Sequence, residues 1–191
     1  IVRMDAYIWD RACRYLKEWR EEGWNIVPLS VNMSRLNFYQ PDIASVVLEI
    51  VDKYELDPEM LKLEITESAY TENPRELIQS VERFKAYGFE IMMDDFGSGY
   101  SSLNFLQEVP IDILKVDKSF VHHSMDSAMA RHVLISVVSM VRDMDMQVVA
   151  EGVETEEQFT CLKDMQCDYM QGYYFSRPIP ADLFKQRYLI K

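Results

Sequence analysis

Several features that would place a chain in a specialised class are scarce or missing in this sequence. Its 191 residues include three cysteines, an odd number that makes a poor disulfide framework, and their spacing fits no metal-binding motif. No apolar run reaches the ~20 residues that a membrane-spanning helix needs, and no secretory signal peptide is visible. Free thiols favour a reducing environment. We therefore expect a cytoplasmic chain, free or as the cytoplasmic part of a membrane-anchored protein, without direct membrane contact.

Positive charge is also scarce. The chain has 20 Lys and Arg against 32 Asp and Glu, which gives a formal net charge of −12. Such a balance argues against a general surface for DNA or RNA polymers. It is compatible with a phosphate-bearing substrate, provided that metal ions mask the acidic groups locally.

The residues that are present describe an ordinary globular protein. Hydrophobic residues make up 48% and charged residues 27% of the chain. The length allows one substantial core and is short for two. Because no low-complexity linker interrupts the sequence, we expect a single domain over residues 1–191.

Apolar segments with strand character alternate with segments of helical period. Strands are predicted at 26–31, 61–67, 91–93, 113–117, 147–153 and 168–172. Helices are predicted at 4–22, from Asp42 onward, at 74–88, near 102–107, at 127–144 and from Thr155 onward. Strands separated by helices call for a parallel α/β architecture, either an open doubly wound sheet or a (β/α)8 barrel with two strands absent.

Polar side chains at the ends of these strands favour the barrel. Each predicted strand carries one at or near its C-terminal end: Asn32, Glu64, Asp94, Lys115, Glu151 and Gln171. A barrel gathers all its strand ends around one mouth. An open sheet concentrates function at one switch point and leaves the outer strands uninvolved. The sequence therefore predicts a TIM-like barrel with about six of its eight strands.

The pair Asp94-Asp95 is the most informative element. It follows the apolar run 91–93 and precedes Gly97 and Gly99, so both carboxylates can face one cavity where the strand alternation relaxes. Two carboxylates this close repel each other unless a proton or a metal ion offsets them. A loop with two solvated acids is the simpler interpretation of such a pair alone.

Taken together, the strand-end residues suggest a metal site. Hard oxygen ligands suit Mg²⁺ or Mn²⁺ rather than zinc, and a double-acid position lets one carboxylate bridge two metals for phosphoryl displacement. Lys115 could orient an attacking water or neutralise charge that develops on phosphate. Individually, Asn32 could cap a turn, Lys115 could form a structural ion pair, and Glu64 or Glu151 could form salt bridges.

At this point the sequence resembles the EAL-domain phosphodiesterases of bacterial cyclic di-GMP signalling. The matching segments follow the family order and cover nearly the whole chain: Val31-Asn32-Met33-Ser34, Leu63-Glu64-Ile65-Thr66-Glu67-Ser68, Asp94-Asp95-Phe96-Gly97-Ser98-Gly99-Tyr100-Ser101-Ser102-Leu103, Leu114-Lys115-Val116-Asp117, Val149-Ala150-Glu151-Gly152-Val153-Glu154-Thr155 and Gln171-Gly172-Tyr173-Tyr174-Phe175-Ser176-Arg177-Pro178.

The resemblance implies a role for each motif residue. Asn32, Glu64 and Asp94 would hold one metal, with Asp94 bridging and Asp95 serving the second metal. Lys115 would orient the nucleophilic water, and Glu151 would be either a second-metal ligand or the general base. Support of the substrate or of the loop 96–102 would come from Gln171, Glu67, Asp117 and Glu154.

One departure concerns the motif that gives the family its name. No Glu-Ala-Leu occurs in the 191 residues, and its Glu would be a metal ligand on an early barrel strand. The resemblance implies that the family's first two strands and first helix lie before Ile1. We therefore expect an N-terminally truncated EAL domain that is inactive as this chain alone.

The resemblance leaves two classes of function open. The first is a metal-dependent phosphodiesterase that hydrolyses cyclic di-GMP to linear pGpG. The alternative is a catalytically inactive EAL-like receptor for cyclic di-GMP, or a dimerisation module. In either case the implied context is a homodimer attached to sensory or GGDEF domains.

Overall fold

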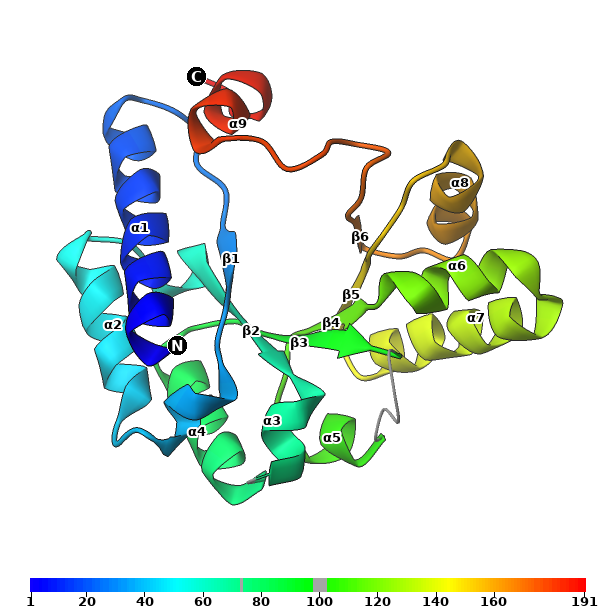
Figure 1. Ribbon diagram of the computed structural model, residues 1–191, viewed down its shortest axis with the longest axis horizontal. Coiled ribbons are helices and arrows are strands. Elements are labelled where there is room, and N and C mark those ends of the chain that lie inside the picture. Colours follow the sequence, from blue (N-terminus) through cyan, green and yellow to red (C-terminus); the bar gives the residue numbers. More distant parts are fainter. Residues whose placement is uncertain (73, 98–102) are drawn as a thin grey trace. The chain divides into compact units, whose positions relative to one another are not determined.

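The structure is a computed structural model that describes residues 1–72, 74–97 and 103–191 (Figure 1). Six strands follow one another in the sheet in sequence order, β1-β2-β3-β4-β5-β6. The pairs β1–β2, β3–β4, β4–β5 and β5–β6 are parallel. Parallel neighbours need a crossover connection, which the intervening helices provide. The predicted α/β class with six strands is therefore confirmed.

The chain divides into two compact units. Unit 1 comprises Ile1–Ile91, Glu108–Pro110 and Ile179–Lys191, and unit 2 comprises Met92–Gln107 and Ile111–Pro178.

The elements of unit 1 are α1 (Val2–Glu21), β1 (Leu29–Asn32), the 3-10 helix η1 (Arg35–Tyr39), α2 (Ile43–Lys53), the 3-10 helix η2 (Pro58–Met60), β2 (Leu61–Thr66), α3 (Glu67–Glu72), α4 (Pro74–Ala86) and α9 (Ala181–Tyr188). The strand β3 (Ile91–Phe96) begins in unit 1 and continues in unit 2. The other elements of unit 2 are α5 (Leu103–Glu108, whose last residue is counted with unit 1), β4 (Ile113–Val116), α6 (Lys118–Asp126), α7 (Ala128–Asp143), β5 (Gln147–Ala150), α8 (Glu156–Asp164) and β6 (Tyr169–Met170).

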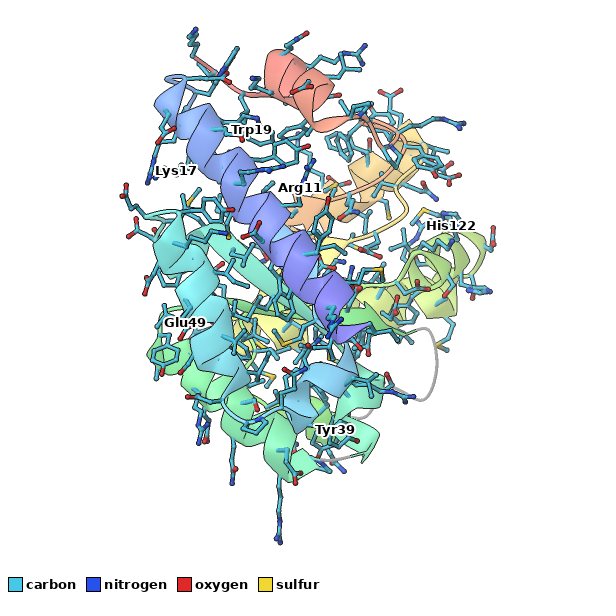
Figure 2. The ribbon with its side chains drawn as sticks, turned by 60° about the vertical axis from the view of Figure 1, so that its left-hand side comes forward. Arg11, Lys17, Trp19, Tyr39, Glu49 and His122 are labelled. Atoms are coloured by element: carbon cyan, nitrogen blue, oxygen red, sulfur yellow. The ribbon has the colours of Figure 1, made fainter. Side chains whose placement is uncertain are left out.

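Helix α1 is amphipathic, and its buried face anchors unit 1. Trp9, Cys13, Leu16 and Trp19 are buried at helical spacing. Trp19 and Lys17 point away from opposite sides of the helix in Figure 2, as a separation of two residues requires. Burial raises the pKa of the Cys13 thiol to about 12, so this cysteine behaves as a small apolar side chain.

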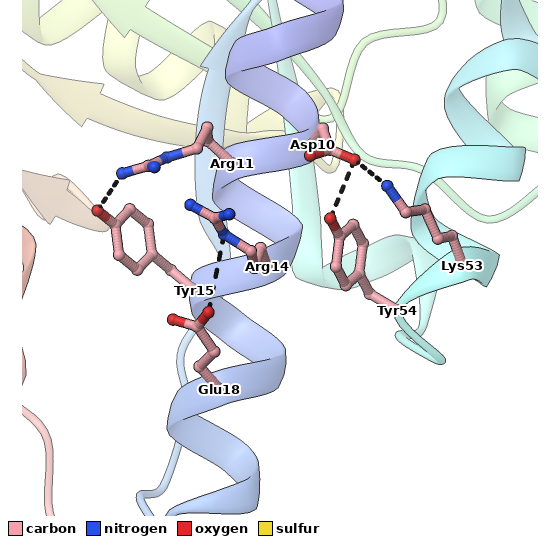
Figure 3. A network of polar contacts seen from close by, with 7 residues as sticks. All are labelled: Asp10, Arg11, Arg14, Tyr15, Glu18, Lys53 and Tyr54. Atoms are coloured by element: carbon pink, nitrogen blue, oxygen red, sulfur yellow. Dashed lines mark hydrogen bonds and ion pairs between the residues drawn. The ribbon is translucent and has the colours of Figure 1, made fainter.

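Polar contacts join the outer face of α1 to the C-terminal end of α2 (Figure 3). The carboxylate of Asp10 accepts hydrogen bonds from Lys53 Nζ at 2.6 Å and from the Tyr54 hydroxyl at 3.0 Å. The hydrogen bond from Lys53 lowers the pKa of Asp10, and burial opposes it. These contacts fix how α2 lies along α1.

The C-terminal segment returns to unit 1. Phe184 on α9 stacks on Trp19 with ring centroids 6.0 Å apart. Asn25 N donates to Ile190 O at 2.7 Å, which forms an isolated antiparallel bridge. Residues about 165 positions apart therefore build one packed corner of unit 1.

Unit 2 is built around a strand that is covered on both faces. All four residues of β4 are buried, which is typical of parallel strands packed between helices. Met92, Ile113 and Val149 form a buried apolar cluster across β3, β4 and β5. Leu134, Val138 and Val141 are buried on α7, one or two helical turns apart.

The structure corrects several predicted boundaries. The acids Asp94 and Asp95 lie within β3, which continues to Phe96, rather than following its end. Glu67 begins the helix α3 instead of ending β2, and β5 stops at Ala150, before Glu151. Three of the described α-helices were not predicted, namely α3, α6 and α9. Among the residues that the structure describes, no helix has both the length and the hydropathy to cross a membrane.

Candidate active site

The acidic pair of β3 occupies an irregular stretch of the strand. Met93 pairs with Leu114 and Phe96 with Val116, so three steps on β3 oppose two steps on β4. Asp95 absorbs the extra residue with a left-handed backbone at φ +61°. Asp and Asn are the side chains that tolerate this conformation best after glycine. The bulge thus breaks the strand alternation at Asp94-Asp95, where the sequence predicted that it relaxes.

Lys115 lies between two carboxylates. Its Nζ is 2.8 Å from Asp94 Oδ1 and 2.8 Å from Glu151 Oε1. The lysine is only 5% exposed, and the two carboxylates are half-buried, with Asp94 within β3 and Glu151 directly after β5. Parallel register explains the meeting, because Lys115 is opposite Val149 on β5, and Glu151 N donates to Val116 O at 3.0 Å.

Asp117 follows β4 directly and caps the next helix. Its Oδ1 accepts from Ser119 N at 2.8 Å and also from the Ser119 hydroxyl, and its own N–H donates to Phe96 O at 2.9 Å. Partial burial raises the pKa of Asp117, but the hydrogen bonds from Ser119 and the N–H of Lys118 lower it by more. The net effect is a pKa of Asp117 below its ordinary value. Through its hydrogen bonds, Asp117 connects the ends of β3 and β4 to the start of α6.

Replacing Asp117 with Ala is expected to lower the free energy of unfolding by about 1 kcal/mol at pH 7, the usual cost of a lost N-cap. The pKa of Asp117 is lower in the folded state than in the unfolded state, where it is about 3.8. The negative charge therefore stabilises the fold above that pH, and this stabilisation is lost as the pH falls through the lower pKa of the folded state. Urea unfolding should show a smaller difference between wild type and variant at pH 3 than at pH 7. Asp117→Asn, which keeps an acceptor without the charge, is the matched control. An equal difference at both pH values would contradict the role of the charge.

The end of β5 is tied to the segment that follows β6. Gln171 N donates to Ala150 O at 2.9 Å, and Val153 N donates to Gln171 O at 3.1 Å. Gly172 packs so tightly here that an added Cβ would lie 2.0 Å from Val153 O. Gln171 is therefore held beside the residue pair Ala150-Glu151 by its backbone, although it lies just beyond β6 rather than within it.

Glu154 lies near the start of α8. Its N–H donates to Gln158 Oε1 at 2.7 Å, next to a capping box formed by Thr155 and Gln158. The Glu154 residue is exposed. The backbone hydrogen bond of Glu154 has a structural role, because it helps to fix the start of α8.

In unit 1, Asn32 and Glu64 form a second polar pair. They are directly opposite each other on β1 and β2, and Met33 N donates to Glu64 O at 2.8 Å. Asn32 is exposed, whereas Glu64 is buried. The Trp9 indole N–H donates to Asn32 O at 3.1 Å, which holds this end of β1 against α1.

A buried carboxylate supports the same turn. Asp5 Oδ2 accepts from Asn37 Nδ2 at 2.6 Å and from Ser34 N at 3.2 Å. Both Asp5 and Asn37 are buried, and no motif predicted either residue or Trp9. The only sequence signal was indirect, because Asp5 and Trp9 lie on the apolar face of α1.

The donor set fits a hard divalent cation. Asn32, Glu64, Asp94, Asp95 and Glu151 supply oxygen atoms alone, the chemistry that Mg²⁺ and Mn²⁺ prefer. Asp94 Oδ1 is buried without a hydrogen bond of good geometry, although Lys115 lies within ion-pair distance. Within residues 1–72, 74–97 and 103–191, no three His, Cys, Asp or Glu side chains are grouped as a metal site. Convergence of all the strand-end residues on one mouth therefore stays a prediction.

Part of one predicted element lies outside the described residues. Glu67 was expected to support the loop 96–102, and residues 98–102 of that loop are not among those that the structure describes. Glu67 itself opens α3, in unit 1.

Comparison with known proteins agrees with this arrangement. The EAL domain family model matches residues 1–178. Cyclic di-GMP phosphodiesterase NbdA of Pseudomonas aeruginosa is 35% identical over 180 residues, which cover 94% of this chain and 23% of NbdA. The oxygen sensor protein DosP of Escherichia coli is 36% identical over 182 residues, which cover 95% of this chain and 23% of DosP. The chain thus spans about a quarter of the length of these curated relatives.

Solved structures show the same fold. The PaMucR phosphodiesterase in complex with c-di-GMP matches with a TM-score of 0.88 at 33% identity, over 96% of this chain and 74% of that chain. The match confirms the predicted TIM-like barrel class. Sequence motifs, strand order and structural similarity lead to one conclusion: the chain belongs to the EAL domain family.

Proposed function

We propose that the protein containing this chain is a metal-dependent phosphodiesterase that hydrolyses cyclic di-GMP to linear pGpG. The observation that carries the proposal is the buried Lys115, whose ammonium lies 2.8 Å from both Asp94 and Glu151. A cation held between two acids is suited to a site where water must be oriented and negative charge on phosphate offset. The names of NbdA and PaMucR as phosphodiesterases support the same chemistry.

In the proposed reaction, water adds to one phosphorus atom and the bond from that phosphorus to the 3′ oxygen breaks. The product pGpG keeps the phosphate on its 5′ side, and the 3′ oxygen takes up a proton. Lys115 Nζ would donate a hydrogen bond to the attacking water and hold its oxygen toward phosphorus. Glu151 would accept the water proton if it acts as the general base.

Mg²⁺ or Mn²⁺, when bound, would lower the pKa of water and stabilise charge on the phosphate oxygens. Asn32, Glu64 and Asp94 are the proposed ligands for one ion, with Asp94 shared. Asp95 is the proposed ligand of the second ion, together with Glu151 if Glu151 is a ligand rather than the base. The negative charges of these Asp and Glu side chains would also attract the metal ions.

The context proposed for this chemistry is a larger cytoplasmic signalling protein. NbdA and DosP are about four times as long as the stretch that matches, which leaves room for sensory or GGDEF domains. We propose a homodimer as the working assembly. Glu67, Asp117, Glu154 and Gln171 would support the loop and the substrate.

Asp95→Asn in the full-length protein is expected to lower turnover of cyclic di-GMP by at least about 10³-fold. Asn keeps the left-handed backbone at φ +61°, so the loss reports the missing charge rather than a refolded bulge. Chromatographic detection of pGpG measures turnover, and calorimetry measures binding of cyclic di-GMP. We expect binding of cyclic di-GMP to persist, because the proposed role of Asp95 is to hold the second metal ion rather than the bases or sugars.

Two results would contradict the proposal. Turnover by Asp95→Asn close to the wild-type rate would remove Asp95 from the mechanism. A wild-type protein that binds cyclic di-GMP without producing pGpG, in Mg²⁺ and in Mn²⁺, would instead identify a receptor.

A further inference from the structure

His122 lies in contact with the strand end that carries Glu151. It is half-buried on the second turn of α6, and its Nε2 is 3.0 Å from Gly152 O. Figure 2 shows His122 on this helix. Because a carbonyl oxygen only accepts hydrogen bonds, the geometry requires the proton on Nε2.

Gly152 is packed closely against helix α6. Gly152 has φ +69°, and an added Cβ would lie 2.3 Å from Lys118 Cβ and 3.6 Å from His122 Nε2. The turn after Glu151 therefore rests directly on the first two turns of α6. A side chain at position 152 would therefore collide with the start of that helix.

These contacts close a ring that includes the candidate catalytic pair. From Lys115 the chain runs through Val116 to Asp117, which caps α6 by accepting from Ser119 N. Helix α6 then presents His122 to Gly152, and Glu151 returns to Lys115 at 2.8 Å. Within unit 2, the hydrogen bond of His122 thus completes a path that leads from one member of the ion pair to the other.

We propose that His122 is a positioning residue for Glu151, an inference that rests on the proposed phosphodiesterase function. By holding the Gly152 carbonyl, His122 fixes the backbone from which the Glu151 side chain extends toward Lys115. Its hydrogen bond is to the Gly152 carbonyl, so it acts on Glu151 through the turn. Residues that hold catalytic or metal-binding groups from behind typically affect activity about 10- to 100-fold.

The test uses three variants of the full-length protein. His122→Ala removes the donor, and His122→Gln restores an amide donor near the position of Nε2. His123→Ala is the matched control, because His123 is exposed and its Nδ1 contacts Ser119 O of its own helix at 2.6 Å. We expect His122→Ala to lower kcat about 10-fold with little change in KM, His122→Gln to recover most of the rate, and His123→Ala to match wild type.

A crystal structure of each variant gives a readout that does not depend on turnover. In His122→Ala the Glu151 carboxylate should leave its place beside Lys115 Nζ or occupy more than one conformer, and in His122→Gln it should return. An unchanged Lys115–Glu151 distance and an unchanged kcat would overturn the proposal. A fall in thermal stability with kcat unchanged at a temperature where the variant is folded would show a purely structural role. If the wild type produces no pGpG, the proposed function fails, and the displacement of Glu151 in the crystal structures still decides the role of His122.

Discussion

Lys115→Met in the full-length protein should lose about 10³-fold or more of its activity toward cyclic di-GMP. Met keeps the length and much of the volume of lysine but removes the charge between Asp94 and Glu151. Two partly buried carboxylates then lose a shared partner, and breaking a buried ion pair typically costs about 3–5 kcal/mol of stability. Product formation and urea unfolding measure the two effects separately.

Lys62→Met is the matched control for this experiment. Lys62 also pairs with a carboxylate, that of Glu90, but the lysine side chain is 18% exposed and the pair includes none of the proposed site residues. We expect a small loss of stability and near wild-type turnover. If Lys115→Met were as active as Lys62→Met, the ion pair at Lys115 would be structural and the proposed mechanism would be wrong.

Gly172→Ala is expected to have the second large effect, on folding rather than chemistry. The new Cβ would meet the backbone of Val153, at 2.0 Å from its oxygen and 2.3 Å from its nitrogen. Val153 N already donates to Gln171 O and Val153 O accepts from Tyr174 N, so these backbone atoms have little freedom to withdraw. We expect a loss of at least about 3 kcal/mol, at the upper end of overpacking effects, measured by urea unfolding with circular dichroism.

Gly23→Ala separates this steric effect from ordinary backbone strain. Gly23 has φ +84° and no atom within 4 Å of an added Cβ. Alanine at this position should lower the free energy of unfolding only by the cost of the left-handed conformation, about 1–2 kcal/mol. If the Gly172→Ala protein were as stable as the Gly23→Ala protein, the backbone of Val153 could move to accommodate the new Cβ, and the expected steric effect would be wrong.

The fold class could be predicted because the hydrophobic periods are strong and local. The buried strand Ile113–Val116 and the amphipathic α1 both carry patterns that leave little choice of structure. Helix α6 was missed because its buried positions are few, Val121 and Ser124. The helix starts at the N-cap Asp117. Sequence analysis had interpreted Asp117 as support for the substrate or the loop, and so not as a helix cap.

The candidate site was predictable to the level of residue types. Alternation along β3 and the positions of strand ends indicated which acids could meet, and Lys115 indeed lies between Asp94 and Glu151. The bulge at Asp95 could not be located from sequence, since it depends on register with β4. The contact of His122 with Gly152 joins residues 30 positions apart, and no local pattern encodes it.

The return of α9 to unit 1 has a consequence for the order of synthesis. Unit 2 consists of residues that are contiguous but for Glu108–Pro110, whereas unit 1 needs Ile179–Lys191 as well as its N-terminal part. On the ribosome, all of unit 2 therefore emerges before Phe184, the stacking partner of Trp19. Until residues 179–191 emerge, the aromatic end of α1 stays open to chaperones and to neighbouring nascent chains.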